Sequence, residues 1–351
     1  MFKKKLLVLL SFIIVSPIII QAQTFEETIG YLSSAAAEKY VEPVITAFGS
    51  NLNAGWVNFV PQPKLAGFDL NIKIVGMGTF LNNKAKTFST EGVFNFNSDQ
   101  ADAILKNSGI TSSNPNYESV KQALLSKKWP VSFSGPTIIG KKSESLKIYF
   151  AGDETLGLES YTETIADVKG LLDETPILPM GAPQITLGTL FGTSVSFRYF
   201  PSIEIDNLGK FQFYGFGVMH NPGVWFNNPL PVDIGIGFFS QKMKIGSVLE
   251  SNAIQYGIFV SKTIGTVVAL IPYAGVTMES SKTTINYEFE YESYTNGNLG
   301  KYKDKISLEL EGENTSAFIF GTTIKLALLN LNIDYKMAKY KTLSAGVSFE
   351  F

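Results

Sequence analysis

The sequence predicts an all-β fold: a transmembrane up-and-down antiparallel β-barrel of about 14 strands with a short helical N-terminal plug. Three observations predict it. Many segments alternate apolar and polar residues with a period of two. Beyond the first 22 residues no apolar run reaches the 18 residues that a membrane-spanning helix needs. Finally, tight and long connections alternate along the chain, as strands that run up and down a barrel require.

Residues 1–22 are predicted to be a signal peptide. Lys3, Lys4 and Lys5 precede LLVLLSFIIVSPIII, an apolar stretch of 15 residues, and cleavage is expected after Ala22. The alternative is an uncleaved anchor, although Pro17 and the short apolar stretch disfavour a spanning helix. The mature chain is therefore expected to begin at Gln23, outside the cytoplasm.

Residues 23–53 form the predicted plug segment. Thr24 and Glu27 have the spacing of a capping box, and Pro43 is expected to kink or split the helix. Apolar side chains recur at helical spacing at Ile29, Leu32, Ala36, Tyr40, Val44 and Phe48. A barrel of about 14 strands has a lumen wide enough to need filling, and this segment would fill it. The alternatives are a periplasmic lid and an ordinary packing helix.

Residues 54–351 are predicted to form the barrel. The stretch LAGFDLNIKIVGMGTF, for example, alternates Ile72 and Ile74 with Asn71 and Lys73. The predicted strands lie near 55–61, 66–80, 88–96, 131–139, 144–152, 184–190, 194–202, 209–220, 230–243, 253–262, 267–279, 315–327, 331–339 and 342–351.

The connections divide into two classes. Tight turns are expected at FGT (191–193), IGT (264–266) and LLN (328–330), on the periplasmic side. Extracellular insertions are expected near 97–130, 153–183 and 280–314. The first contains two predicted short helices, SDQADAILKN and NYESVKQALLSK. The second combines a possible helix with the turn-rich PILPMGAP, and the third contains the hairpin formed by INYEFEYES and ISLELEGE.

Composition excludes several functions. With a net charge of −2 and a single arginine, Arg198, the chain has no basic surface for nucleic acid. It has no cysteine and one histidine, His220, so we expect no metal site and no cofactor. His220 could serve a lipid hydrolase only beside a positioned serine, and we expect no enzyme. A comb of Glu288, Glu290, Glu292, Glu309 and Glu311 is more typical of a solvated hairpin face than of a calcium site.

A secreted or periplasmic β-sandwich, or a soluble barrel, would also show alternating strands. The signal segment, the strand count, the order of the turns and aromatic residues near strand ends favour the outer membrane of a Gram-negative cell instead. The aromatic residues are Tyr199, Phe200, Phe211, Phe213, Tyr340, Phe349 and Phe351.

Four stretches resemble a known signal or known families. The C-terminal LSAGVSFEF, with Phe349 and Phe351, resembles the assembly signal that barrel-insertion machinery reads in outer-membrane barrels. Chain length, the helical segment TFEETIGYLSSAAAEKYVEPVITAFGSNLNAG and the strand count resemble the long-chain fatty-acid transporter (FadL-like) family. FGVMHNPGVWFNNPLPVDIGIGFFSQKMKIG and IPYAGVTMESS are similar to an outer-membrane barrel family of unknown function.

The transporter resemblance implies passive transport of a hydrophobic or amphiphilic small molecule past the plug. The residues expected to line the plug and its ligand are Phe25, Tyr40, Val44, Phe48 and Asn51. Expected partners are outer-membrane lipid, the insertion machinery and a hydrophobic solute, and the barrel is expected to be a monomer. The alternative function is a non-transport structural or adaptor barrel that docks surface or secretion machinery.

Overall fold

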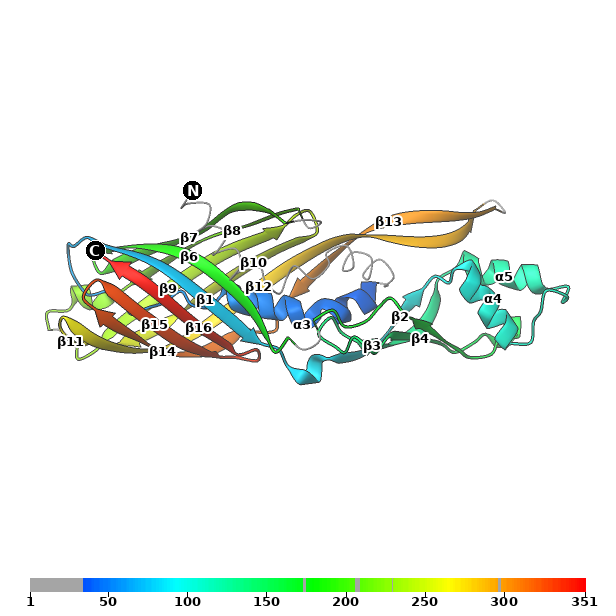
Figure 1. The fold of residues 1–351 in the computed structure, drawn as a ribbon, viewed down its shortest axis with the longest axis horizontal. Coiled ribbons are helices and arrows are strands. Elements are labelled where there is room, and N and C mark those ends of the chain that lie inside the picture. Colours follow the sequence, from blue (N-terminus) through cyan, green and yellow to red (C-terminus); the bar gives the residue numbers. More distant parts are fainter. Residues whose placement is uncertain (1–33, 173–174, 206–208, 229, 296–297) are drawn as a thin grey trace.

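The computed structural model describes residues 34–351 apart from 173–174, 206–208, 229 and 296–297. Figure 1 shows a β-barrel at one end of an elongated molecule and a small sheet with two helices at the other. Helix α3 (Ser34–Leu52) runs from the barrel toward this small sheet. The predicted signal peptide, the Thr24–Glu27 capping box and Phe25 lie outside the described residues. Helix α3 continues through Pro43 as one element rather than splitting there.

The barrel consists of ten antiparallel strands, and pairing of β10 with β12 and of β1 with β16 closes it. Closure pairs the edges that an open sheet would expose. The order of the strands around the barrel is β1, β6, β7, β8, β9, β10, β12, β14, β15 and β16. Their bounds are Asp69–Phe80, Ile177–Leu190, Thr193–Ile205, Gly209–His220, Asp233–Ile245, Leu249–Ser261, Val268–Thr295, Ser316–Leu326, Leu329–Met337 and Thr342–Glu350, and β11 is the short Ile264–Gly265.

The expected count of about 14 barrel strands is wrong, since the barrel has ten. Three expected strands, near 88–96, 131–139 and 144–152, pair with one another in a separate sheet. The fourth, near 55–61, has no strand neighbour and is not a strand. Alternation predicts that a segment is extended with two unlike faces, but it does not predict which segments pair.

The separate sheet and two helices form a unit that we call the head. Its strands β2 to β5 and helices α4 and α5 span Thr87–Phe94, Trp129–Pro136, Leu146–Phe150, Tyr161–Ile165, Ser98–Asn107 and Tyr117–Ser126, with 3-10 turns at Asn83–Ala85 and Glu154–Leu156. Both helices coincide with segments expected to be helical. Helix α4 begins with a capping box between Asn97 and Gln100. Edge-to-face contacts join Phe94, Phe96, Phe150 and Trp129 into an aromatic cluster, which is part of the same hydrophobic core as α3 and the barrel residues around it.

The second expected insertion, 153–183, ends too late, because PILPMGAP belongs to barrel strand β6 rather than to a loop. Pro179 and Pro183 sit opposite Gly78 and Ile74 of β1 in an unbroken register. Proline removes a hydrogen-bond donor and is rare inside sheets, which is why the sequence favoured a turn here.

The two ends of the barrel differ. At one, which we call the turn end, β6 and β7 are joined through Phe191–Gly192 and β14 and β15 through Ala327–Leu328. The 12-residue connection 221–232, with a 3-10 turn at Pro222–Trp225, also lies there. The other, the insertion end, carries the head and the hairpin of β12 with β13 (Asn298–Glu311). Long loops of outer-membrane barrels face outward, so we assign the insertion end to the outside.

The hairpin that carries the five glutamates is balanced by lysines. Glu288 lies opposite Lys305 in the register of β12 and β13, and Lys282 forms an ion pair of 2.7 Å with Glu309. Opposite charges across a strand pair stabilise a solvated face. This arrangement agrees with the solvated-face interpretation of the acidic comb.

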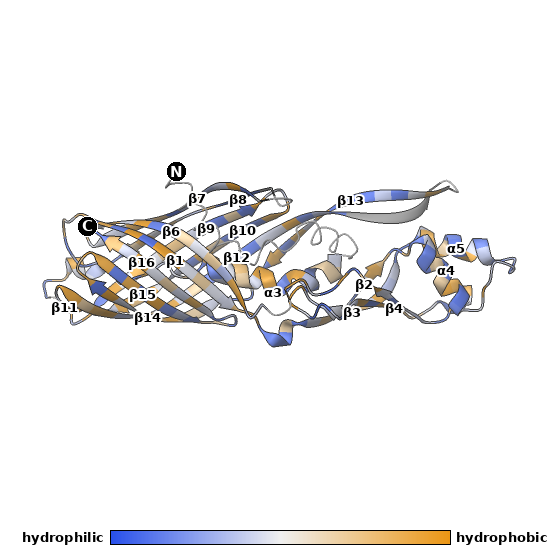
Figure 2. Cartoon of the chain, in the orientation of Figure 1, coloured by the Kyte–Doolittle hydropathy of each residue, from blue (hydrophilic) through white to orange (hydrophobic). Residues whose placement is uncertain are grey.

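The barrel's outer surface is an apolar belt. Every barrel strand carries outward apolar side chains, and orange residues alternate along the barrel strands in Figure 2. They include Ile72, Ile74, Ile185, Leu187, Phe197, Tyr214, Phe216, Ile236, Phe238, Ile254, Ile258, Leu270, Val276, Phe318, Phe320, Leu331, Ile333, Leu343 and Val347. In the described residues, no helix has the length and apolarity needed to cross a bilayer. A closed barrel with such a belt spans a membrane, and the protein is located in the outer membrane.

Helix α3 packs closely against the barrel wall at Gly49. A side chain at this position would collide with Ser281 of β12. Glycine inside a helix costs about 1 kcal/mol relative to alanine, so its presence here reflects the close approach of helix and wall.

We therefore expect Gly49→Ala to lower the free energy of unfolding by about 1–2 kcal/mol despite the better helix propensity of alanine. Ser281→Gly should offset much of this loss, because it removes the atoms that the new methyl group meets. Urea unfolding of the four proteins of this double-mutant cycle measures the coupling. Additive effects of the two substitutions would contradict the predicted contact.

Candidate functional site

Residues 50–64, which we call the luminal segment, pass through the barrel from the insertion end to the turn end. At the start of the segment, Ser50 Oγ lies 2.7 Å from Thr342 Oγ1, where β16 begins. At its end, the backbone oxygen of Lys64 accepts a hydrogen bond from Gly192 in the β6–β7 turn. The chain then reverses and enters β1. The barrel is thus closed around its own preceding segment.

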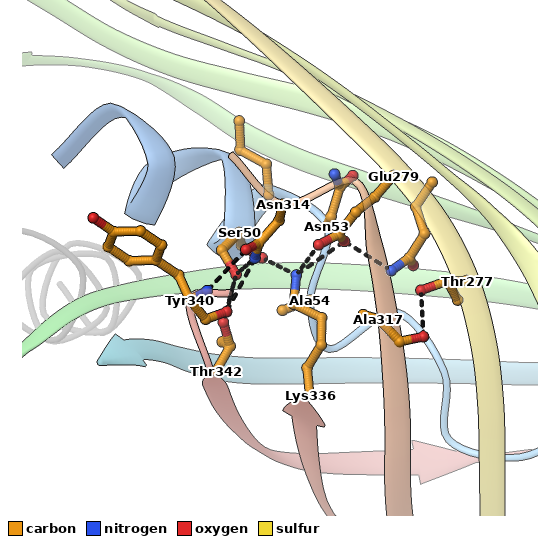
Figure 3. A network of polar contacts seen from close by, with 12 residues as sticks. Ser50, Asn53, Ala54, Thr277, Glu279, Asn314, Ala317, Lys336, Tyr340 and Thr342 are labelled. Atoms are coloured by element: carbon orange, nitrogen blue, oxygen red, sulfur yellow. Dashed lines mark hydrogen bonds and ion pairs between the residues drawn. The ribbon is translucent and has the colours of Figure 1, made fainter. Parts of the chain in front are cut away.

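A polar network fixes the luminal segment at the insertion end (Figure 3). Asn314 Nδ2 donates to Ser50 Oγ at 3.0 Å and to the backbone oxygen of Tyr340, also at 3.0 Å. Asn51 donates to Leu178 O at 2.8 Å and accepts from Thr79 Oγ1 at 2.7 Å. Ser50 and Asn51 are therefore tied to several strands of the wall.

The carbonyl groups that the end of helix α3 leaves without helical partners are satisfied by side chains. Lys336 Nζ donates to Ser50 O at 2.8 Å, and Trp56 Nε1 donates to Leu52 O at 3.0 Å. Lys336 also forms a buried ion pair of 3.0 Å with Glu279. A cation at the C-terminal end of a helix complements the helix dipole, so Lys336 both caps α3 and holds it in the barrel.

Arg198 holds the centre of the segment. Its guanidinium lies 3.8 Å from the centre of the Trp56 ring, whose other neighbour is the stacked ring of Phe239, with ring centres 5.2 Å apart. It donates to Ala54 O at 3.0 Å and to the side-chain oxygens of Gln184 and Gln241. In the described chain these acceptors are all neutral. Five donors in a fixed plane allow arginine to satisfy several acceptors at once.

Successive backbone groups of the segment are bound by different strands. Lys73 Nζ donates to Gly55 O at 2.9 Å and Gln184 Nε2 to Trp56 O at 3.1 Å. Farther along, the acceptors Val57 O, Asn58 O and Pro61 O are bound by Tyr273, Thr323 and Asn221. Val60 N also donates to Ser261, and Ser50 contacts β15 and β16 as described above. In total, nine of the ten barrel strands bind the segment, eight through their own residues and β8 through Asn221, which directly follows it.

A cavity of about 330 Å³ lies beside the luminal segment at the turn end. Trp56 and Phe239 line it, and hydroxyl side chains of β6 and β7 form part of its wall. Arg198, which stacks on Trp56, does not itself line the cavity. A second space, near Lys336 and Asp334, is only about 10 Å³.

The four described residues expected to line the plug lie above this cavity. Val44 and Phe48 are buried in the core that α3 shares with the barrel and the head, and Asn51 is bonded into the wall. Tyr40 lies farther out and donates to Lys169 O of the head at 2.9 Å. Burial raises the pKa of the Tyr40 hydroxyl above its ordinary value. None of the four lines the turn-end cavity.

The two aromatic residues of the expected assembly signal, Phe349 and Phe351, are exposed at the turn end of the seam. The backbones of Phe351 and Leu70 exchange hydrogen bonds of 2.8 and 3.0 Å, so the last residue still pairs with β1. The chain end is thus part of the closure of the barrel.

His220 ends β8, and its Nδ1 lies 3.0 Å from Thr193 Oγ1. Among the described residues no group of three or more metal-binding side chains of the His, Cys, Asp and Glu types comes together.

The sequence pattern missed the residues that bind the luminal segment. Arg198 is the only arginine and lies within an apolar strand pattern, where a buried charge needs partners. Lys73 occupies a position expected to face a wet lumen, and the structure instead pairs it with Gly55. Both polar residues were visible in the sequence, but their acceptors in the luminal segment, Ala54 O and Gly55 O, are backbone atoms and leave no trace in the sequence.

We predict that Arg198→Lys lowers the free energy of unfolding by about 2–4 kcal/mol, because a lysine keeps the buried charge but leaves two of the three acceptors without a donor. The matched control is Lys325→Arg, which exchanges the same residue types in the less buried pair with Glu350. That exchange should cost less than about 1 kcal/mol. Equal losses in urea unfolding of both variants would contradict the role given to Arg198.

Comparison with known proteins gives a family match along the whole chain. A family of unknown function, DUF6588, matches residues 1–351. No curated protein matches. The match supports the expected family of unknown function and gives no support to the fatty-acid transporter resemblance.

Three solved structures illustrate how distant the structural matches are. The N-terminal β-barrel domain of OprF from Pseudomonas aeruginosa is 13% identical, with 45% of this chain and 94% of that chain covered and a TM-score of 0.20. Ail of Yersinia pestis is 12% identical, with 45% of this chain and 96% of that chain covered and a TM-score of 0.21. A loop-deletion mutant of OmpT from Vibrio cholerae is 8% identical, with 82% of this chain and 100% of that chain covered and a TM-score of 0.23. Similarities this low carry no weight for function. The family model of DUF6588, in contrast, matches residues 1–351, and this chain therefore belongs to the DUF6588 family.

Proposed function

We propose that this outer-membrane barrel is a non-transport adaptor, which anchors the head and the β12–β13 hairpin outside the membrane for docking. The luminal segment is the observation that carries the proposal, because wall residues from nearly every strand bind its backbone. Each such bond contributes about 1 kcal/mol net, and a buried carbonyl left without a donor costs about 1–3 kcal/mol. Displacing the segment would lose many of these bonds together.

The connection between α3 and the head supports the same function. Ile138 N donates to Tyr40 O at 3.0 Å, and Tyr40 donates in turn to the head at Lys169. Helix α3 is thus fixed in the barrel at Ser50 and in the head at Tyr40. A docking surface gains affinity when it is held in one conformation, and this helix would hold the head relative to the membrane. We expect no enzymatic activity and a monomeric barrel.

Passive transport of a hydrophobic or amphiphilic compound is the second candidate, and the turn-end cavity favours it. In this function the luminal segment acts as a displaceable plug. The two candidates differ in one respect: transport requires the segment to move, whereas docking requires it to stay.

A disulfide between Ser50→Cys and Thr342→Cys distinguishes them. The two hydroxyl oxygens are 2.7 Å apart, and the chain has no native cysteine that could compete. We expect liposomes containing the reduced protein to show no uptake of a fluorescent fatty acid and no stable conductance, with no change on oxidation. Uptake in the reduced state that oxidation abolishes would overturn the docking proposal in favour of transport.

Cysteine labelling tests the assigned orientation. Glu38→Cys, at an exposed position of α3, should react with a membrane-impermeant maleimide on intact cells. Gln62→Cys, exposed at the turn end, should react only after the outer membrane is permeabilised. The opposite pattern would place the head in the periplasm and exclude docking at the cell surface.

A further inference from the structure

The turn-end cavity has the size of a ligand site and no part in the docking function. Its volume of about 330 Å³ lies within the usual range of small-molecule pockets, about 300–1,000 Å³. Its lining includes Lys64, Gly265 and Glu350 at the turn end. We therefore expect a ligand to enter from the turn end, the side that we assign to the periplasm.

Its wall combines an apolar floor with hydroxyl groups. Trp56, Phe239 and Met219 provide apolar surface. Thr186, Ser194 and Ser196 provide hydroxyl groups, of which Thr186 and Ser196 lie 2.8 Å apart. Hydroxyl groups both donate and accept hydrogen bonds. This wall therefore suits a ligand that carries both hydrogen-bond donors and hydrogen-bond acceptors.

The carboxylates that line the cavity already have partners. Glu350 forms an ion pair of 2.7 Å with Lys325 and also accepts from Asn330. Asp69 accepts from Thr189 at 2.8 Å. Lys64 and Lys325 also line the cavity, so its wall carries two lysines and two carboxylates. A wall whose charges balance favours a ligand without net charge.

Two amide side chains of the wall have an oxygen without a partner. Asn71 is 7% exposed and donates to Ser348, but neither its Oδ1 nor that of Asn58 accepts a hydrogen bond. Both oxygens are covered by neighbouring atoms in this arrangement, so each amide group must turn toward the cavity to meet a ligand donor. A buried acceptor without a donor costs about 1–3 kcal/mol, and a ligand hydroxyl would recover part of it.

We propose that the turn-end cavity binds a neutral carbohydrate of one or two sugar units. Ring hydroxyls would bond to the hydroxyl and amide groups of the wall, while the C–H face of a sugar would pack on Trp56 and its apolar neighbours. A fatty acid fits less well, because its chain would bury these polar groups without satisfying them.

Trp56 allows a direct test. In the full chain with Trp129→Phe and Trp225→Phe, Trp56 is the remaining tryptophan and lines the cavity. The protein is kept in a detergent without a sugar headgroup and titrated with maltose, methyl α-glucoside and sodium decanoate. We expect saturable changes in Trp56 emission with at least one sugar, with a Kd of about 0.1–10 mM, and none with decanoate. No saturable change with either sugar up to about ten times that range, or a response to decanoate alone, would overturn the proposal.

Asn71→Leu and Asn332→Leu form a matched pair. Each removes the side-chain hydrogen bonds of a buried amide group and one unpartnered oxygen, but neither Asn332 nor its partners Tyr273, Thr322 and Thr323 line the cavity. We expect Asn71→Leu to raise the Kd about tenfold, which corresponds to about 1.4 kcal/mol, and Asn332→Leu to change it less than about twofold. Heat-modifiable gel mobility checks that both barrels fold. Equal effects on the Kd would contradict a sugar bound at Asn71.

Discussion

The structure depends on one set of contacts: side chains of the barrel wall that bind the backbone of residues 50–64. This segment is not paired with a strand in a β-ladder, and a backbone carbonyl buried without a donor is costly. Lys336, Arg198, Lys73 and other wall residues supply the donors that a sheet would otherwise provide. The same contacts close the lumen, fix the end of α3 and leave the cavity at the turn end. Barrel, helix and cavity therefore cannot be changed independently.

Because residues 50–64 occupy the lumen, the large insertions are expected to have a different function from the loops of an open channel. In a channel they would surround an entrance, but here helix α3 joins them to the segment that fills the lumen. The aromatic cluster of the head is continuous with the core around α3, and the β12–β13 hairpin continues a barrel strand beyond the wall. The apolar belt holds the molecule in the membrane, while the chemistry available for recognition lies outside it and in the turn-end cavity.

The sequence predicted much of this fold because period-two alternation records which face of a strand is buried. It located the ten barrel strands, both head helices and the hairpin. It overcounted the barrel because alternation does not identify partners, and it missed the start of β6 because Pro179 and Pro183 resemble turn residues. For the site, polar inward positions such as Lys73 were visible. Their partners were not, since Gly55 O and Ala54 O are backbone atoms that any sequence possesses.

The central claim is that the barrel is closed around its own residues 50–64. A density map of the full chain in lipid nanodiscs, determined by electron cryomicroscopy, tests it most directly. We predict continuous density for the segment inside a ring of ten strands, with the Arg198 guanidinium stacked on Trp56. An open lumen, with residues 50–64 outside the barrel, would contradict the account.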